Sequence, residues 1–258
     1  MTFKQGGAGL RRWTPAIAGV FLFAAATGVW AAPAGQDVLP GIIPGSTSGL
    51  TVKSQILILM TILGLLPVMV MMMTSFTRFV IVLSLLRQAL GLQQGLPNRI
   101  ITGVALILTL LVMRPVGMQV WNEAFLPYDQ DKISLETALK TAEVPLSRFM
   151  LAQTSKTALN QIAHLAGEPA DMQPMQRAFT VKMAAFVLSE LKSAFQIGCM
   201  LFIPFLIIDL VVSSVLMAMG MMMLSPLVIS LPFKLLLFVL VDGWTLTVNT
   251  LVGSIHGW

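Results

Sequence analysis

The sequence predicts an all-α fold in which helical hairpins of apolar residues flank a smaller, more polar helical region. Hydrophobic residues make up 56% of the 258 residues and charged residues only 10%, whereas soluble domains carry about 25% charged residues. The apolar residues gather into four long segments separated by turns and by one charged zone, a pattern typical of membrane helices. The composition therefore indicates a membrane protein, or a subunit buried by its partners. It argues against disorder and an ordinary soluble enzyme, and the single cysteine, Cys199, excludes a disulfide framework.

Residues 1–31 are predicted to be a secretory signal peptide. A basic segment without acids precedes an apolar run, which ends in the small residues Ala31 and Ala32. The Arg11-Arg12 pair fits a twin-arginine signal poorly, and the glycines and prolines that follow disfavour an uncleaved anchor. Cleavage leaves 13 bases and 11 acids, so the charge of the whole chain does not indicate a nucleic-acid partner. Residues 32–52 are then a periplasmic linker.

Residues 53–121 are predicted to form the first apolar hairpin. Ile56 to Met73 is a run of 18 residues without a charge, which is long enough for a membrane helix. After a turn at residues 95–98, the second run, Ile100 to Met113, has only 14 residues, whereas a span needs roughly 20. The short run is either extended past a flanking arginine or buried in protein.

Residues 122–192 are predicted to form a small helical domain, because the stretch from Met118 to Lys192 holds eight acids and seven bases. Apolar residues recur at helical spacing after Ser134, which marks a helix start, and Gly167-Glu168-Pro169 marks a stop. The connection after the first apolar segment carries Arg78, Arg87 and Arg99 and no acid. By the positive-inside rule that connection is cytoplasmic, so the charged domain is periplasmic.

Residues 193–258 are predicted to form a second apolar hairpin, which completes four conventional spans. Prolines within the apolar segments indicate irregular backbone, and at membrane depth this is tolerated only where protein or a cavity adjoins it. The prolines concerned are Pro67, Pro115, Pro204, Pro226 and Pro232.

Four charges are predicted to be buried in or beside apolar segments: Arg78, Asp209, Lys234 and Asp242. A charge in such a place is costly and pairs with another charge or faces a polar cavity. Asp209 and Lys234 each stand in a long apolar stretch, so an ion pair across the hairpin is plausible. Two interpretations stay open: the pair fixes the register of two helices, or it relays protons.

No enzymatic site is predicted. His164 and His256 are roughly 90 residues apart without a carboxylate at ligand spacing, and no nucleotide-binding glycine loop follows the signal peptide. An intramembrane protease built on Asp209 and Asp242 would need both in one cavity, and neither lies in a protease-like motif. Cys199 lies in an apolar run, which favours an inert, buried thiol. We therefore expect no catalytic residue, no cofactor and no metal.

The second of two methionine triplets, Met221 to Met223, follows Gly220 and precedes Ser225-Pro226, so it is expected at a bend between helices. Methionine is flexible and fills irregular gaps. The triplet therefore either packs against helices or closes a pore by excluding water and ions.

Five ordered blocks of the chain resemble the FliP family. They are residues 72–78 (MMTSFTR), 189–198 (SELKSAFQIG), 202–210 (FIPFLIIDL), 220–223 (GMMM) and 231–244 (LPFKLLLFVLVDGW). The resemblance covers nearly all of the mature chain.

The resemblance implies a subunit of the export gate of flagellar type III secretion, in the bacterial inner membrane and flagellar basal body. Five copies would assemble with four of FliQ and one of FliR into a helical, conical channel, joined or assisted by FlhB, FlhA and FliO. The substrates would be unfolded rod, hook and filament subunits, driven mainly by the proton motive force. Family members sit largely above the bilayer plane, on the periplasmic side.

The resemblance also assigns roles to particular positions. Met221, Met222 and Met223 correspond to a gasket that seals the closed pore, and Phe149 and Glu190 correspond to contacts between subunits. A further aromatic contact of the family falls on Ile162, which keeps the apolar bulk but lacks the ring.

Two alternative functions remain. The equivalent subunit of a virulence injectisome shares the core blocks, but the predicted signal peptide favours the flagellar member. A proton-coupled secondary transporter would need internal inverted repeats, and the sequence shows none.

Overall fold

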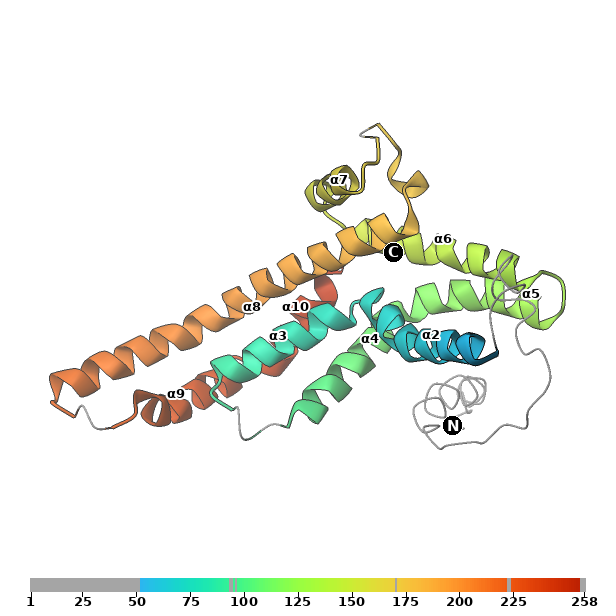
Figure 1. The fold of residues 1–258 in the computed structure, drawn as a ribbon. Coiled ribbons are helices and arrows are strands. Elements are labelled where there is room, and N and C mark those ends of the chain that lie inside the picture. The colour runs from blue at the N-terminus through green and yellow to red at the C-terminus, as the bar shows by residue number, and fades with distance from the viewer. Residues whose placement is uncertain (1–51, 93–94, 96, 170, 222–223, 256–258) are drawn as a thin grey trace, which may run out of the picture. The chain divides into compact units, whose positions relative to one another are not determined.

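The computed structural model describes residues 52–92, 95, 97–169, 171–221 and 224–255. This described part is all α, with no strand in it, as the sequence predicts. The predicted signal peptide and nearly all of the predicted linker lie outside it. In chain order (Figure 1) the elements are α2 (Val52–Met72), α3 (Phe76–Ala89), α4 (Asn98–Val120), the π-helical η2 (Trp121–Phe125), α5 (Leu126–Asp129), α6 (Leu135–Gln153), α7 (Lys156–Leu165), the short 3-10 turn η3 (Pro174–Gln176), α8 (Phe179–Ala218), α9 (Pro226–Leu240) and α10 (Gly243–Gly253).

The first apolar region forms three helices, because the chain bends by 70° between α2 and α3. At the bend, the Thr74 hydroxyl donates to the Met71 carbonyl (2.8 Å) and accepts from the Phe76 amide (3.3 Å). A hydroxyl that bonds to nearby backbone groups competes with the helical hydrogen-bond pattern. The break therefore falls where the methionine run gives way to Thr74 and Ser75.

The helices of the polar region begin at serines. Ser134 accepts from the amide of Thr137 at the start of α6, as the sequence indicates, and Ser155 accepts from the amide of Ala158 at the start of α7. Such side chains satisfy amides that have no partner in the first helical turn. Gly167, with φ of 73°, follows the end of α7, because the left-handed conformation there costs glycine little.

The helix α8 is continuous over 40 residues, about 60 Å at 1.5 Å per residue. The predicted boundary at residue 192, where the sequence changes from polar to apolar, lies inside this helix and does not interrupt it. Pro204 also lies within α8. The change from polar to apolar residues alters what surrounds the helix. It does not end the helix, because the residues on both sides of position 192 are compatible with helical backbone.

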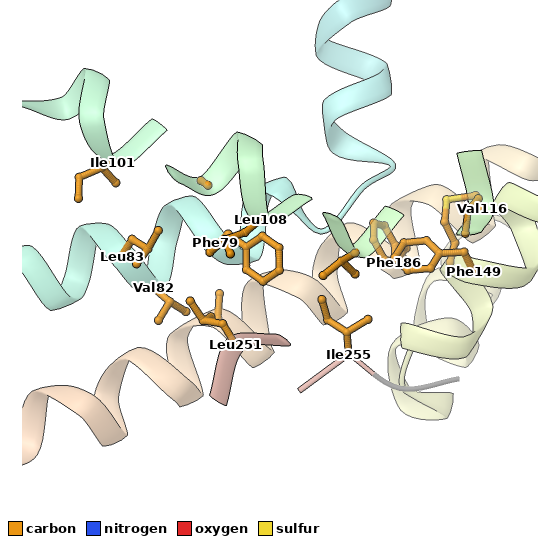
Figure 2. Close-up of a cluster of buried hydrophobic side chains, with 14 residues drawn as sticks. Phe79, Val82, Leu83, Ile101, Leu108, Val116, Phe149, Phe186, Leu251 and Ile255 are labelled. Carbon is orange, nitrogen blue, oxygen red and sulfur yellow. The ribbon is translucent and has the colours of Figure 1, made fainter. Parts of the chain in front are cut away.

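The main hydrophobic core lies where α3, α4, α8 and α10 meet, with side chains of α6 added (Figure 2). Phe79 of α3 and Phe186 of α8 are fully buried in it. A second cluster of buried side chains lies around the end of α3: Leu86, Ala89, Leu90, Phe205 and Phe238. The helices α3 and α8 approach closely, because a Cβ built on Gly198 would lie 2.3 Å from Leu85 Cδ1.

Large apolar surfaces remain uncovered. None of the α2 side chains that the structure describes is buried. In the described part, two helices are long and apolar enough to cross a membrane, Asn98–Asp129 and Phe179–Ala218. Two bent pairs, α2 with α3 and α9 with α10, qualify only if each pair is counted as one span. In the described residues, the four predicted spans thus correspond to two unbroken helices and two bent pairs. Cys199, expected to be buried, is exposed.

Candidate functional site

Arg78 of α3 and Glu190 of α8 form a buried ion pair with two parallel contacts. Arg78 Nε donates to Glu190 Oε2 at 2.8 Å, and Nη2 donates to Oε1 at 2.5 Å. The remaining terminal nitrogen, Nη1, donates to the carbonyl oxygen and the hydroxyl of Ser254, at 2.8 and 2.9 Å. Ser254 is the C-cap of α10, so the guanidinium also lies at the negative end of that helix. A single side chain thus joins α3, α8 and α10.

The geometry explains how two charges are accommodated in an apolar core. Removing an ion from water costs several kcal/mol unless its hydrogen bonds are replaced. Both Glu190 oxygens accept from Arg78, and all three guanidinium nitrogens donate. The planar fork of arginine matches a carboxylate in this way, whereas the compact ammonium of lysine cannot.

Polar contacts also fix the N-terminal half of α8 to the helices of the polar region. Ser189, beside Glu190, accepts from the backbone amide of Ser155 at 3.0 Å and so contacts the start of α7. Buried Lys182 donates to Glu143 Oε1 of α6 at 3.1 Å. The helix α8 therefore contacts α3, α6 and α7, and it is joined to α10 through the Arg78 guanidinium.

A further buried cation lies near the other end of the contact between α3 and α8. Lys234 of α9 is 3% exposed; its Nζ lies 2.6 Å from Asp209 Oδ2 of α8 and 3.0 Å from the carbonyl oxygen of Ala89, the last residue of α3. The other carboxylate oxygen of Asp209 accepts from the hydroxyl of buried Ser230 at 2.6 Å. The two charges considered as a pair from the sequence thus lie in contact, with two polar groups that the sequence reasoning did not name.

The methionine triplet lies at the connection between α8 and α9. The amide of Gly220 donates to the carbonyl of Met217, and the amide of Met221 to that of Leu216; with a left-handed glycine this is a common way for a helix to end. The next helix starts at Pro226 after the N-cap Ser225. Met221 is 41% exposed, and Met222 and Met223 lie outside the described residues.

The residues that the resemblance assigns to subunit contacts lie at different depths within the chain. Phe149 of α6 is buried, with its ring centroid 5.8 Å from that of Phe186 (Figure 2). Glu190 is fully buried against Arg78. Ile162 of α7 is half-buried. Packing within one chain accounts for the burial of Phe149 and Glu190, and a contact with a second copy stays a prediction for all three.

Asp242 differs from its prediction as a buried charge. It is exposed within the chain, where it precedes α10 in a left-handed conformation with φ of 48°. Aspartate tolerates this conformation better than most residues, so the chain can turn by 65° between α9 and α10. The following Gly243 lies against the ring of Phe238, where a Cβ would come within 2.2 Å of ring carbons. Asp242 therefore serves a turn.

The residues missed from the sequence are serines and backbone carbonyls. Ser230 precedes Lys234 by four residues, so both lie on one face of α9, and this spacing could have identified it. Ser189, Ser254 and the Ala89 carbonyl carry no such signal, because their partners are brought near only by the fold.

The two ionic clusters have the chemistry of structural contacts. In the described residues, no group of three or more histidine, cysteine or acidic side chains is placed to hold a metal. The clusters position helices, and the described side chains that stay exposed include many large apolar ones, Met221 among them. We call residues 221–223 the methionine loop.

Comparison with known proteins supports a family relationship. Residues 59–251 match the FliP family. The chain is 51% identical over 229 residues to the flagellar biosynthetic protein FliP of Pectobacterium carotovorum subsp. carotovorum, covering 87% of this chain and 89% of that protein. It is 48% identical over 204 residues to the protein of the same name from Bacillus subtilis (strain 168), covering 79% of this chain and 91% of that protein. It is 46% identical over 202 residues to the protein of the same name from Aquifex aeolicus (strain VF5), covering 78% of this chain and 84% of that protein.

Proposed function

The chain belongs to the FliP family, whose matched relatives are flagellar biosynthetic proteins, and we propose that it is the core channel subunit of the flagellar type III export gate. Its role is to pass unfolded rod, hook and filament subunits across the inner membrane without catalysing a reaction itself. The observation that carries the proposal, beside the family, is the amount of apolar surface left uncovered on α2, α8 and α9. A surface of this kind requires lipid or other subunits.

The proposed assembly contains five copies of this chain with FliQ and FliR, and FlhB, FlhA and FliO are associated with it. Two features support oligomerisation over four lipid-facing spans. Two of the candidate spans are bent by 70° and 65°. Buried ion pairs fix α3, α8 and α9 to one another, and the opposite sides of α8 and α9 remain apolar and exposed. Sister subunits would cover these sides.

The proposed pore seal is the methionine loop. Met221 is exposed at the connection between α8 and α9, where a flexible apolar side chain can meet its copies in neighbouring subunits. Such a ring excludes water and ions while it is closed.

The proposed location is the inner membrane within the flagellar basal body, with the polar region from η2 to α7 on the periplasmic side. The polar region carries exposed charges such as Glu136 and Lys140, which face solvent. Arg87 and Arg99, which flank the connection between α3 and α4, support the cytoplasmic side for that connection.

The native mass and subunit content of the complex, extracted in mild detergent with FliQ and FliR co-expressed, test this function. We expect one large complex with several copies of the chain. A monomer under conditions that preserve FliQ and FliR complexes would contradict the proposal. Deletion of the gene should abolish flagella and motility. Normal motility with failed effector secretion would favour the injectisome alternative instead, and solute uptake by the isolated chain would favour a transporter.

A further inference from the structure

We propose that Ser75 is a two-state hinge, which aims α2 in two directions while α3 and the main core stay in place. In the orientation of this structure the Ser75 hydroxyl leaves α3 uncapped, and in the second orientation it caps α3. The hinge belongs to the subunit itself, whichever complex the subunit enters. Because α2 carries many exposed apolar side chains, the hinge sets the direction in which the subunit presents that surface to lipid or to a partner.

The hydroxyl of Ser75 is buried without a hydrogen bond. Ser75 is fully buried, and its Oγ has no hydrogen-bond partner among the described residues. The residue occupies the N-cap position of α3, where a serine hydroxyl accepts from the backbone amide two or three residues further on. For α3 these are the amides of Thr77 and Arg78. A buried hydroxyl without a partner costs free energy, so a conformation that supplies this contact is favoured by it.

Two other serine N-caps show which backbone angle differs. At the starts of α6 and α7, Ser134 and Ser155 have ψ of 159° and 139°, and each accepts from the amide three residues further on. Ser75 has nearly the same φ, −69°, but its ψ is 3°. An extended backbone is the conformation in which a residue caps a helix. Rotation of ψ at Ser75 toward the extended range therefore turns its side chain toward the start of α3, and it turns α2 with it.

The neighbouring hydroxyl stabilises the orientation of this structure. Thr74 Oγ1 accepts from the Phe76 amide at 3.3 Å and donates to the Met71 carbonyl at 2.8 Å. The direction of the Phe76 amide relative to Thr74 depends on ψ of Ser75. Rotation of that angle therefore breaks the contact of Thr74 with the amide while it caps α3 with Ser75. The two adjacent hydroxyls thus favour opposite orientations of α2.

The helix α2 can change direction with little loss of core packing. None of its described side chains is buried, and of the described residues before the break Met73 is the one that packs against the main core. The helices α2 and α3 meet at a bend of 70° (Figure 1). By contrast, buried cations fix α3 at both ends, Arg78 in its first turn and Lys234 at its last carbonyl. Rotation at Ser75 therefore moves α2 and leaves α3 in place.

Pulsed EPR distances between nitroxide labels on α2 and α8 test the hinge in the full chain, purified in detergent. The native Cys199 is exposed on α8, and Leu57→Cys adds a label at an exposed position of α2. We expect two distances, one of which matches this structure. Ser75→Ala should lower the population of the other distance about fivefold, the effect of losing a serine cap. Thr74→Val should raise it about fivefold, because it removes the contact with the Phe76 amide.

Two controls separate the hinge from general loosening. Ser84→Ala removes a hydroxyl from an exposed position of the same helix α3 and should leave both populations unchanged. A second label pair joins Cys199 to Leu111→Cys, which is exposed on α4. Both of these positions lie on helices of the main core, so this pair should give one distance in every variant.

Each outcome decides the question. A single distance between residues 57 and 199 that neither Ser75→Ala nor Thr74→Val changes would overturn the hinge and show a static bend. Equal broadening by both variants would overturn it as well, because local loosening has the same sign for both, whereas the hinge requires opposite signs. If Ser75→Ala fails to fold, Thr74→Val decides: a second distance that does not grow contradicts the hinge.

Discussion

Arg78 and Glu190 are 112 positions apart in the sequence and meet through two parallel hydrogen bonds in the centre of the fold. The contact joins the start of α3 to the N-terminal third of α8, and the same guanidinium reaches the end of α10. This buried polar contact joins three helices that also share the main core.

Removing one member of this pair should destabilise the subunit strongly. Glu190→Gln leaves the Arg78 charge buried without a counter-charge, and breaking a buried pair costs about 3–5 kcal/mol. Arg78→Lys should also destabilise, because lysine cannot make the two-pronged contact and reach Ser254 together. Thermal unfolding of the detergent-purified chain measures the effect. The double variant Arg78→Met/Glu190→Leu should recover part of the loss; if it is worse than Glu190→Gln alone, the burial of an unpaired charge is not the cause.

Enlarging Gly198 should separate α3 from α8. A Cβ at this position would lie 2.3 Å from Leu85 Cδ1, so Gly198→Val forces the leucine or the helix to move, at a cost of about 1–3 kcal/mol. Leu85→Ala in the same chain should recover part of that cost, because it removes the atoms that clash. The recovery is measured from the melting temperatures of the wild type, the two single variants and the double variant. If the two substitutions are simply additive, the close contact is not what limits residue size here.

Replacing the methionine loop with serines should open the resting channel to ions. The hypothesis is that Met221–Met223 seal the pore with flexible apolar side chains, and hydroxyls would admit water. Potassium efflux from liposomes containing the assembled complex should rise, while the native mass of the complex stays the same. The control is replacement of Met71 to Met73, a triplet at the end of α2 away from that connection. An unchanged ion barrier in an assembled complex would sink the hypothesis.

The exposed pair Glu136–Lys140 should titrate visibly and contribute little to stability. A hydrogen bond from Lys140, together with its charge, lowers the pKa of Glu136, and the same bond and charge raise the pKa of Lys140. A carboxylate with a lowered pKa stabilises the fold above its unfolded pKa, and this contribution is lost as pH falls through the folded value. The contribution of the lysine is present below its unfolded pKa and is lost as pH rises through its folded value.

NMR titration of the Glu136 carboxyl carbon measures the lowered pKa of this group directly. The pKa of Glu136 should return toward its ordinary value in Lys140→Met, with no measurable change in melting temperature at neutral pH, because exposed pairs are screened by solvent. A Glu136 pKa that does not respond to Lys140→Met would contradict the assigned cause.

The sequence predicts the helical class and the apolar regions well, because composition and periodicity report on single segments. It also indicates Asp209 and Lys234 as partners, since each is the one charge in its apolar stretch. It does not indicate the partner of Arg78. Glu190 stands beside Lys192 at the edge of a polar stretch, which makes a solvated helix face equally plausible. Only the contact between α3 and α8 shows that Glu190 is buried against Arg78 and does not lie on a solvated face.

The ends of the helices are harder to predict from the sequence than the helical segments themselves. The change of polarity near residue 192 is real, yet α8 continues through it, because helix continuation depends on backbone hydrogen bonds and propensity. The division between α2 and α3 depends on the hydroxyl of Thr74 and its two local bonds. Asp242 was expected to be buried because of its apolar neighbours, whereas its left-handed backbone conformation places it in an exposed turn.

The continuity of α8 has a mechanical consequence. From Glu190 to Ala218 the helix is about 42 Å long; it is held near one end by the Arg78 contact and again at Asp209 by the Lys234 contact. A rod of this length is a lever arm. A tilt of about 2° around Glu190 displaces the far end by about 1.5 Å, the width of a carbon–carbon bond. A small rotation of α8 at the buried ion pair is therefore a larger displacement at Ala218, where the helix ends.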